Sequence, residues 1–247
     1  HAELAGQMSE TIGFIGLGLM GAGFCKRLIA TGRRVVGYDL DPARRAEAEA
    51  LGVALAASPA EVAERANPVC IAVTTTKAVQ AVVSGDGGIL SAKLKPGAIV
   101  VDFSTTEIGV TKALAATLTE AGIGFIDAPV SGGPPAAEAG KLAIMAGGAP
   151  ETIAAVRSLA ESLGLFTHMG AVGTGQATKL VNQALCLTNY VVVAESLRLA
   201  EAYGVDADKI PAALAPGLGN SAVLQAMMPR MVARDFAPKG YARQVLR

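Results

Sequence analysis

GFIGLGLMG, residues 13–21, places Gly16, Gly18 and Gly21 in the spacing G-x-G-x-x-G. After a strand, the first glycine allows a tight turn and the second lets the backbone approach a pyrophosphate. The third lets the following helix pack closely on the strand. Glycine-rich turns are common, so the motif needs support from its surroundings. Alone it does not separate a dinucleotide-binding turn from an ordinary glycine-rich turn, and dinucleotide binding is the prediction that its surroundings must support.

The surroundings of the turn agree with that prediction. An apolar run at 11–16 precedes it, and a helix expected over 19–30 begins with Leu19 and Met20. Free amide groups at the start of such a helix bind an anion. The next strand ends at Asp39, where an acidic residue binds the ribose hydroxyls of a dinucleotide. We therefore expect dinucleotide binding by this part of the chain.

Asp39 also bears on the choice of cofactor. Its carboxylate would repel a 2′-phosphate, so the sequence favours NAD over NADP. Arg44 and Arg45 lie nearby and leave NADP as the less favoured alternative. The plain alternative for Asp39 is a solvated loop aspartate ahead of Pro42.

Strand-like runs alternate with Ala-rich helical segments, such as 42–51 and 105–121, in the first two thirds of the chain. The apolar runs are 11–16, 34–39, 68–73, 98–103, 122–127, 142–146 and 165–168. Strand–helix–strand repetition predicts a parallel sheet covered on both faces, with ligands at the carboxyl ends of its strands.

The pattern changes near residue 172, where the strand-like runs end. No Pro or Gly occurs over 176–203, which predicts one long helix between domains, and helical patterns follow over 206–214 and 221–232. We expect a Rossmann-type doubly wound α/β domain over 11–171, followed by an all-α domain over 172–247. Residues 1–10 are interpreted as a tag remnant and disordered start.

The composition excludes several classes of function. Of 247 residues, 51% are apolar and 17% charged, which excludes a disordered chain. Lys plus Arg and Asp plus Glu are both 21, so no basic excess exists for nucleic acid. The longest uncharged stretch contains prolines and glycines, which argues against a membrane span. Two histidines exclude a His-rich metal cluster, and no metal is expected.

The cysteines indicate where the protein works. Cys25, Cys70 and Cys186 are odd in number, widely spaced and set among apolar residues. The pattern predicts buried free thiols and a reducing, cytoplasmic location.

A second candidate site follows the fifth predicted strand of the first domain. Residues 127–137 read DAPVSGGPPAA, with a hydroxyl at Ser131 and unshielded amides at Gly132 and Gly133. Such a group suits a carboxylate. A turn that merely joins two elements is an equally good interpretation of these residues.

A third candidate site lies at the domain boundary. Residues 173–183 read GTGQATKLVNQ, and Lys179 and Asn182 share one face of the predicted helix because they are three apart. A lysine there could move a proton at an oxygen whose carbon exchanges hydride with nicotinamide. An exposed helix lysine is the more common case, and the spacing alone favours it.

Together these residues resemble the β-hydroxyacid dehydrogenase family, which includes 3-hydroxyisobutyrate dehydrogenase, tartronate semialdehyde reductase and L-threonate dehydrogenase. The specific elements are DAPVSGG at 127–133 and G-x-G-x-x-x-K-x-x-N at 173–182, in family order. The segment 102–105 (DFST) is also similar, and the resemblance covers 11–247. It implies an NAD(P)-dependent hydroxyacid dehydrogenase that acts on a CH–OH group of a small 3-hydroxy or 2-hydroxy acid.

The resemblance also implies a role for individual residues. Lys179 would donate or accept the proton, and Asn182 would position the substrate and the lysine. The cofactor would be contacted by the glycine turn, Asp39 and three further residues. The residues implied to bind the substrate carboxylate are Ser131, Gly132 and Gly133. The three further cofactor residues are Val73, Thr74 and Thr105.

Departures from the family pattern keep alternatives open. Thr74 stands where the family often has Pro, and Gln183 follows Asn182 as in sugar-acid branches. A Lys-Asp motif is expected after Leu246 and the sequence ends at Arg247, so we expect a truncated chain. The alternatives are an imine reductase, a 6-phosphogluconate dehydrogenase relative, or a non-catalytic dinucleotide-binding module. His168 is interpreted as a hydrogen-bonded strand-end imidazole rather than a proton carrier.

The long helix predicts association. Its residues between 180 and 200 are apolar on almost every side, and such a helix must be covered all round. We expect a homodimer, or a homotetramer built from dimers, with the second half of this helix near the interface.

Overall fold

The computed structural model describes residues 10–235 and 237. The expected tag remnant over 1–10, apart from Glu10, and the chain end at 246–247 lie outside the described residues. The chain folds as two compact units, one up to Lys179 and one from Leu180 onward. The division falls inside the long helix, later than the boundary expected near residue 172.

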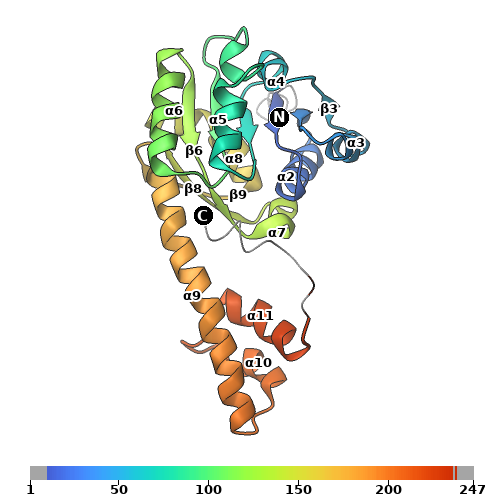
Figure 1. Cartoon of the computed structure of the whole chain (residues 1–247), viewed down its shortest axis with the longest axis vertical. Coiled ribbons are helices and arrows are strands. Elements are labelled where there is room, and N and C mark those ends of the chain that lie inside the picture. Colours follow the sequence, from blue (N-terminus) through green and yellow to red (C-terminus); the bar gives the residue numbers. More distant parts are fainter. Residues whose placement is uncertain (1–9, 236, 238–247) are drawn as a thin grey trace, which may run out of the picture. The chain divides into compact units, whose positions relative to one another are not determined.

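The first unit is built on one sheet with the strand order β3-β2-β1-β4-β5-β6-β8-β7, and β9 pairs with β8 (Figure 1). The strands are β1 (Thr11–Ile15), β2 (Arg34–Tyr38), β3 (Ala54–Leu55), β4 (Val69–Ile71), β5 (Ile99–Asp102), β6 (Gly124–Asp127), β7 (Val130–Ser131), β8 (Leu142–Gly148) and β9 (Gly164–Gly170). This is the Rossmann-type architecture expected from the glycine turn.

The sheet is parallel from β3 to β6, as expected, and departs from the expected parallel arrangement only after β6. Strand β8 runs antiparallel to both β6 and β7, and only β9 is again parallel to it. A parallel connection needs a crossover of about a dozen residues, usually a long helix. Here Pro129 and the glycines at 132 and 133 turn the chain back through a short helix, so β8 returns in the opposite direction.

The helices cover both faces of the sheet or belong to the second unit. They are α2 (Leu19–Ala30), α3 (Pro42–Ala50), α4 (Pro59–Arg65), α5 (Thr76–Ser84), η1 (Ile89–Ser91), α6 (Ile108–Glu120), α7 (Gly133–Ala139), α8 (Pro150–Leu163), α9 (Thr174–Ala202), η2 (Ala207–Lys209), α10 (Ile210–Leu214) and α11 (Ala222–Val232). Local chemistry sets several starts. The side chains of Asp41, Ser58 and Thr75 accept a backbone N–H in the first turn of α3, α4 and α5.

Two hydrophobic clusters lie on the two faces of the sheet. Phe14 packs in the cluster that includes residues of α2 and α8, whereas Ile15 packs in the cluster of α4, α5 and α6. Adjacent strand residues point to opposite faces, so a fully buried strand carries apolar residues without alternation. This double burial leaves the ends of the strands as the accessible edges of the sheet.

The second unit has a small core of its own. Val193 of α9 packs against Leu224 and Met228 of α11, with Leu197 and Ile210 partly buried beside them. Within residues 10–235 and 237, no helix is long and apolar enough to cross a membrane.

The cysteines differ from the expectation at one position. Cys25 and Cys70 are buried free thiols, as expected, and burial raises the pKa of the Cys25 thiol to about 12. Cys186 is only partly buried because it lies on α9 in the second unit, where the core is small. The prediction that all three are buried is therefore wrong for Cys186.

Candidate active site

The glycine turn between β1 and α2 has the geometry that its spacing predicts. Gly16 has a φ of +94°, and a Cβ there would overlap the carbonyl group of Ala72. A Cβ on Gly21 would overlap the carbonyl oxygen of Gly16, so this glycine allows the close approach of helix and turn. Gly18 differs, because a Cβ there would meet nothing within 4 Å.

Open space at Gly18 lies where a pyrophosphate would approach. Gly18 is the N-cap of α2, it makes no side-chain cap hydrogen bond, and the first turn carries no acidic residue. The amides of Leu19 and Met20 open this helix, where unpaired N–H groups and the helix dipole favour an anion. The residues present therefore fit the diphosphate of a dinucleotide.

Asp39 ties the end of β2 to the glycine turn. Its Oδ2 accepts the amide of Leu17 at 2.7 Å, and its Oδ1 accepts the amide of Asp41 at 2.8 Å. The half-buried side chain thus holds the backbone of the glycine turn and of the loop after β2 together. Arg45 donates to the carbonyl oxygen of Asp39 at 2.9 Å, whereas Arg44 pairs with Glu47.

The loops after β4 and β5 are joined by Ser104. Its hydroxyl oxygen accepts the amide of Val73 at 3.0 Å, and its own amide donates to Asp102 Oδ1 at 2.9 Å. Thr74 and Thr105 lie beside these anchored residues, and Thr105 is exposed. The predicted cofactor contacts Val73, Thr74 and Thr105 thus come from two loops that are connected to each other.

Two buried carboxyl groups lie at the carboxyl ends of β5 and β6. Burial raises the pKa of Asp102 to about 7, the hydrogen bonds from Ser104 oppose that shift, and the charge of Asp127 adds to it. Burial also raises the pKa of Asp127, against the amides of Gly173 and Gln176 that donate to it. The sequence pattern gave neither carboxylate a role in the site.

Asp102 gives the protein a pH-dependent stability. Its pKa is raised from 3.8 to about 7 in the folded state, so the folded state holds the proton longer and loses stability as pH rises towards 7. We expect Asp102→Asn to change the free energy of unfolding in a pH-dependent way. Relative to the wild type, the variant should be roughly 1–3 kcal/mol more stable at about pH 8 than it is at about pH 5. Urea unfolding at both pH values measures this, and an equal effect at both would contradict it.

The turn at residues 131–133 depends on its glycines. Gly132 has a φ of +132° and Gly133 a φ of +73°, which L side chains rarely adopt. A Cβ on Gly132 would also lie 2.6 Å from the Cβ of Ala136. Substitution at Gly132 would therefore disturb the turn itself. Ser131 ends β7, where it pairs with Ala143 of β8.

Lys179 lies against this turn. Its Nζ donates to the carbonyl oxygen of Val130 at 2.7 Å, directly before Ser131, and the residue is only 9% exposed. The more common case of an exposed helix lysine is therefore wrong here. The structure brings the two motifs together, through residues that are 49 positions apart in the sequence. Asn182, one turn later on α9, donates from Nδ2 to Oε1 of Gln183 at 3.1 Å.

Sequence reasoning missed two of the residues that fasten α9 to the sheet. Asp127 is fully buried and accepts the amides of Gly173 and Gln176, and the Gln176 side chain is buried as well. Both residues stand inside the quoted motifs, but nothing in their spacing gives them a role. His168 is as expected, because its Nε2 lies 3.0 Å from the oxygen of Gly148 and 2.8 Å from that of Gly170.

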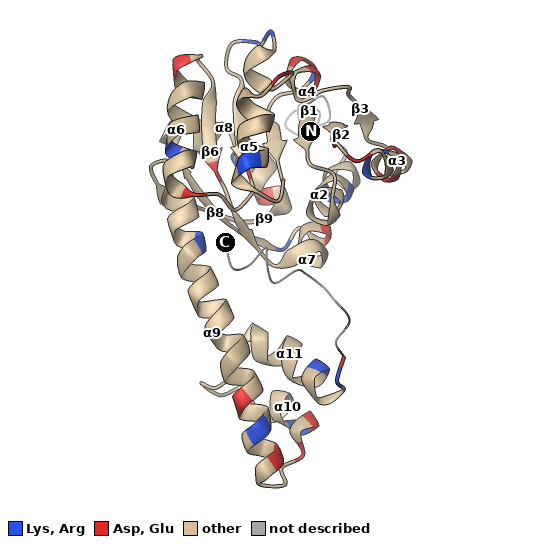
Figure 2. Ribbon diagram, viewed as in Figure 1, with Lys and Arg blue, Asp and Glu red and all other residues tan. Residues whose placement is uncertain are grey.

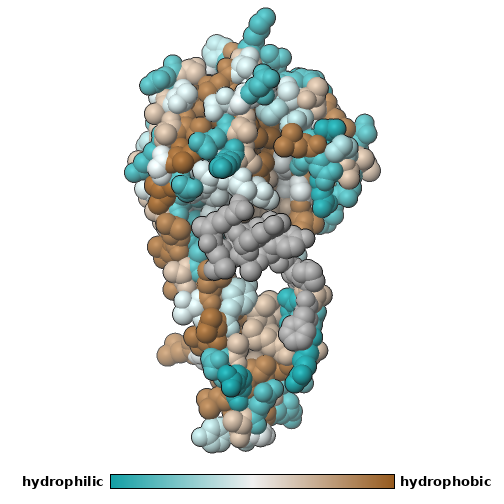
Figure 3. All heavy atoms as spheres, viewed as in Figure 1, coloured by the Kyte–Doolittle hydropathy of each residue, from teal (hydrophilic) through white to brown (hydrophobic). Residues whose placement is uncertain are grey.

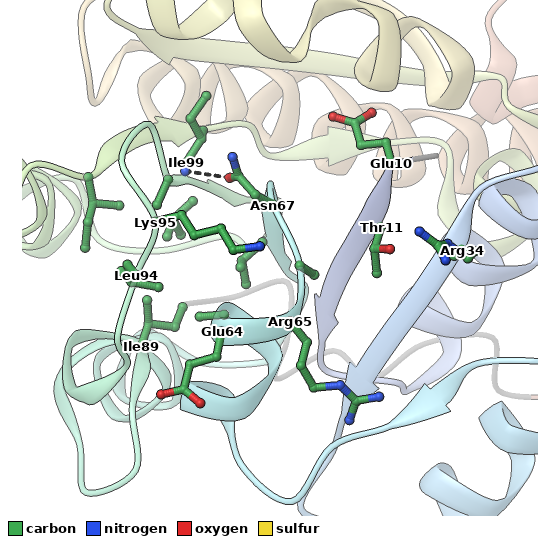
Figure 4. Close-up of a pocket in the computed structure, with 16 residues that line it drawn as sticks. Glu10, Thr11, Arg34, Glu64, Arg65, Asn67, Ile89, Leu94, Lys95 and Ile99 are labelled. Atoms are coloured by element: carbon green, nitrogen blue, oxygen red, sulfur yellow. Dashed lines mark hydrogen bonds between the residues drawn. The ribbon is translucent and has the colours of Figure 1, made fainter. Parts of the chain in front are cut away.

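A cavity of about 380 Å³ lies at the amino ends of the strands, opposite to the carboxyl ends that carry the predicted site residues (Figure 4). It is lined by residues at the amino ends of strands, such as Thr11, Arg34 and Ile99, and the Ile99 amide donates to Asn67. None of the predicted site residues lines it. The glycine turn, Ser131 and Lys179 all belong to the carboxyl-end edge, where α/β sheets bind ligands.

Comparisons with known proteins cover almost the whole chain. The profile described as the NAD binding domain of 6-phosphogluconate dehydrogenase matches residues 11–207. The profile described as NAD-binding of NADP-dependent 3-hydroxyisobutyrate dehydrogenase matches residues 173–246. A probable 3-hydroxyisobutyrate dehydrogenase-like protein of Arabidopsis thaliana, named as mitochondrial, is 34% identical over 100% of this chain and 77% of its own.

Solved structures give the same result. The 3-hydroxyisobutyrate dehydrogenase of Mycobacterium tuberculosis with L-serine has a TM-score of 0.83 and 30% identity, over 96% of this chain and 82% of its own. An imine reductase from Pseudomonas sp. has a TM-score of 0.73 at 22% identity, over 93% and 80% of the two chains, which shows the shared fold alone. With its glycine turn, DAPVSGG turn and buried lysine, the chain belongs to the β-hydroxyacid dehydrogenase family and is an NAD(P)-binding oxidoreductase.

Proposed function

We propose that the protein moves a hydride between NAD and a small 3-hydroxy or 2-hydroxy carboxylic acid, or its semialdehyde or keto form. Lys179 acts as the general acid and base at the substrate oxygen. One observation carries the proposal: the Lys179 amine donates to the carbonyl of Val130, next to the Ser131–Gly133 turn. A carboxylate held by that turn would bring its hydroxyl carbon within reach of the lysine.

Each remaining group has a binding or positioning role in this proposal. The nicotinamide, when bound, supplies the hydride chemistry. The turn at Gly16–Gly21 holds the diphosphate, and Asp39 binds the ribose hydroxyls from its fixed position. Val73 and Thr74 line the cofactor site, and Thr105 contacts the region of the nicotinamide ribose. Ser131, Gly132 and Gly133 bind the substrate carboxylate, and Asn182 orients the substrate with Lys179.

A substrate panel tests the proposal. The full chain is assayed with NAD and with NADP against L-threonate, D-glycerate, 3-hydroxyisobutyrate, 3-hydroxypropionate and 4-hydroxybutyrate, and then with the amide of the best acid. We expect turnover of at least one acid and a much lower kcat/KM for its amide. Equal values for acid and amide would remove the carboxylate from the proposal. Cofactor binding without turnover of any acid in the panel would contradict the proposal and favour an imine reductase or a non-catalytic module.

Asp39 sets the preference for NAD in this proposal. Leu40 is 83% exposed, so an arginine there would not disturb the core. We expect Asp39→Asn with Leu40→Arg to shift the ratio of kcat/KM for NADP over NAD by at least about tenfold, or about 1.4 kcal/mol. Leu40→Gln is the control for the change of size alone. A wild-type protein that already prefers NADP would contradict the role given to Asp39.

We also propose that α9 mediates a homodimer, or a homotetramer built from dimers. The helix is almost uncharged before its C-terminal part, and hydrophobic residues reach the surface along it (Figures 2 and 3). More than half of the surface is exposed at each of Leu180, Val181, Leu185, Val191, Val192 and Leu199. Burying one such side chain contributes roughly 1.5–3 kcal/mol, which favours association.

Leu199, in the second half of α9, is the suitable position for testing association. It is 61% exposed, whereas Leu197 packs on the core of the second unit, where a charge would harm folding. We expect Leu199→Glu to convert a dimer to monomer in light scattering, with Leu218→Glu, on a fully exposed leucine, as the control. A monodisperse wild-type monomer at micromolar concentration would contradict the proposal.

A reducing, cytoplasmic location remains part of the proposal. It is supported by three free cysteines, of which two are buried. Fractionation of the source cells with an antibody to the chain would test it.

A further inference from the structure

Gln176, in the first turn of α9, makes hydrogen bonds to a loop that lies some seventy positions earlier in the chain. The residue is 1% exposed, and its side-chain amide reaches the loop after β5. Nε2 donates to the carbonyl oxygen of Ser104 at 2.9 Å, and Oε1 accepts the amide of Thr106 at 3.1 Å. These two groups lie on either side of Thr105, which is itself exposed. One amide group therefore holds the backbone before and after Thr105.

The backbone of Gln176 is fixed as well. Its amide donates to Oδ2 of Asp127 at 2.8 Å, and the amide of Gly173 donates to Oδ1 at 2.7 Å. Asp127 is fully buried at the end of β6, so it cannot move without its strand. Three residues further along α9, Lys179 donates to Val130, which begins β7. The first turns of α9 are thereby joined to the ends of β5, β6 and β7.

We propose that Gln176, held by Asp127, is the positioning residue that sets where the Lys179 amine stands relative to Thr105. Residues three apart share one face of a helix, so Gln176 and Lys179 are neighbours on α9. Thr105 is the proposed contact to the nicotinamide ribose, and Lys179 is the proposed proton carrier. The inference rests on that proposed function. Gln176 then acts as the spacer between the cofactor side and the proton-transfer side of the site.

The effect of such a spacer is large because hydride transfer depends strongly on geometry. A misplacement of about 1 Å far from the chemistry can cost about 100-fold in rate. A glutamine with a merely structural role would lower stability when replaced, but it would leave the surroundings of the lysine amine unchanged. The test therefore needs a measurement on Lys179 itself, besides the rate.

The variants are chosen to break the side-chain bridge with little change in volume. Gln176→Met removes both side-chain hydrogen bonds. Gln176→Glu keeps an acceptor for Thr106 but places a carboxylate oxygen against the carbonyl of Ser104. Thr178→Val is the matched control, because it removes a side-chain hydrogen bond within α9, to Thr174, without touching the loop after β5.

Rates come first. In the full chain, we expect Gln176→Met to lower kcat by about 10–100-fold, while the dissociation constant of the cofactor changes by less than about threefold. Thr178→Val is expected to stay within about twofold of the wild type. A folded Gln176→Met protein with wild-type kcat would overturn the proposal.

The second measurement is the labelling rate of Lys179 by a trace amine-reactive reagent, read by mass spectrometry without substrate. We expect a several-fold change at Lys179 in both Gln176 variants and none at Lys95, which lies at the amino end of the sheet. An unchanged Lys179 rate in the folded variants would overturn the positioning role, as would loss of folding in both. Turnover by Lys179→Ala would instead contradict the proposed function. The labelling rate of Lys179 does not depend on turnover, so the two failures can be told apart.

Discussion

Lys179→Ala is expected to lower kcat by about 10²–10⁴-fold while the cofactor still binds, because a general acid and base contributes that much to a proton-coupled step. The lysine amine is held by the carbonyl of Val130, beside the turn proposed to bind the substrate carboxylate. No described residue of α2 or of the glycine turn depends on this contact, so the cofactor site should remain intact. Steady-state kinetics and cofactor titration measure the two effects separately.

Two further variants make this prediction specific. Lys179→Arg should also be inactive, because guanidinium does not release its proton at working pH and is larger than the amine. Lys95→Ala removes an exposed lysine at the opposite edge of the sheet and should leave kcat within about twofold. Near-normal kcat in a folded Lys179→Ala protein would show that another group moves the proton.

Gly18→Val is expected to abolish cofactor binding without harming the fold. A Cβ at Gly18 meets nothing within 4 Å, so the folded protein has room for the side chain. The same space is where a diphosphate would approach the start of α2. We expect the dissociation constant to rise by at least about 100-fold, or about 2.7 kcal/mol, with little change in melting temperature.

The neighbouring glycine supplies the contrast. Gly21→Val would drive its Cβ into the carbonyl oxygen of Gly16, so this variant should be strongly destabilised. Gly109→Val, on α6, is the matched control, because a Cβ there also meets nothing within 4 Å. Wild-type affinity in Gly18→Val would mean that the diphosphate does not bind at the glycine turn.

The sequence predicted the helices and strands of the first unit well wherever glycine or proline residues identify the turns between them. The helix expected over 19–30 is α2, with the same bounds, because a glycine turn precedes it and Thr31–Gly32 ends it. The start of α6 was placed at 105, but it lies at Ile108. The amide of Thr106 donates a hydrogen bond to the side chain of Gln176, which keeps Thr106 outside the helix. A contact between residues seventy positions apart cannot be seen in the local sequence pattern.

The candidate site was predictable only as separate motifs. Spacing indicated a turn at 131–133 and a lysine at 179, and the resemblance gave them roles. Only the three-dimensional structure shows that the Lys179 amine donates a hydrogen bond to the carbonyl oxygen of Val130. Asp127 was missed for the same reason, since a buried carboxylate that fastens a distant helix looks in the sequence like any aspartate at a strand end. The reversal of β8 was missed because apolar runs carry no direction.

Transfer of deuterium from substrate to cofactor tests the central proposal most directly. The best acid of the panel is prepared with deuterium at the carbinol carbon and incubated with the full chain and oxidised NAD. We predict that the reduced cofactor carries one deuterium at C4 of the nicotinamide ring, as direct hydride transfer requires. Reduced cofactor that carries hydrogen from the solvent instead, or substrate consumed without reduction of the cofactor, would contradict the account.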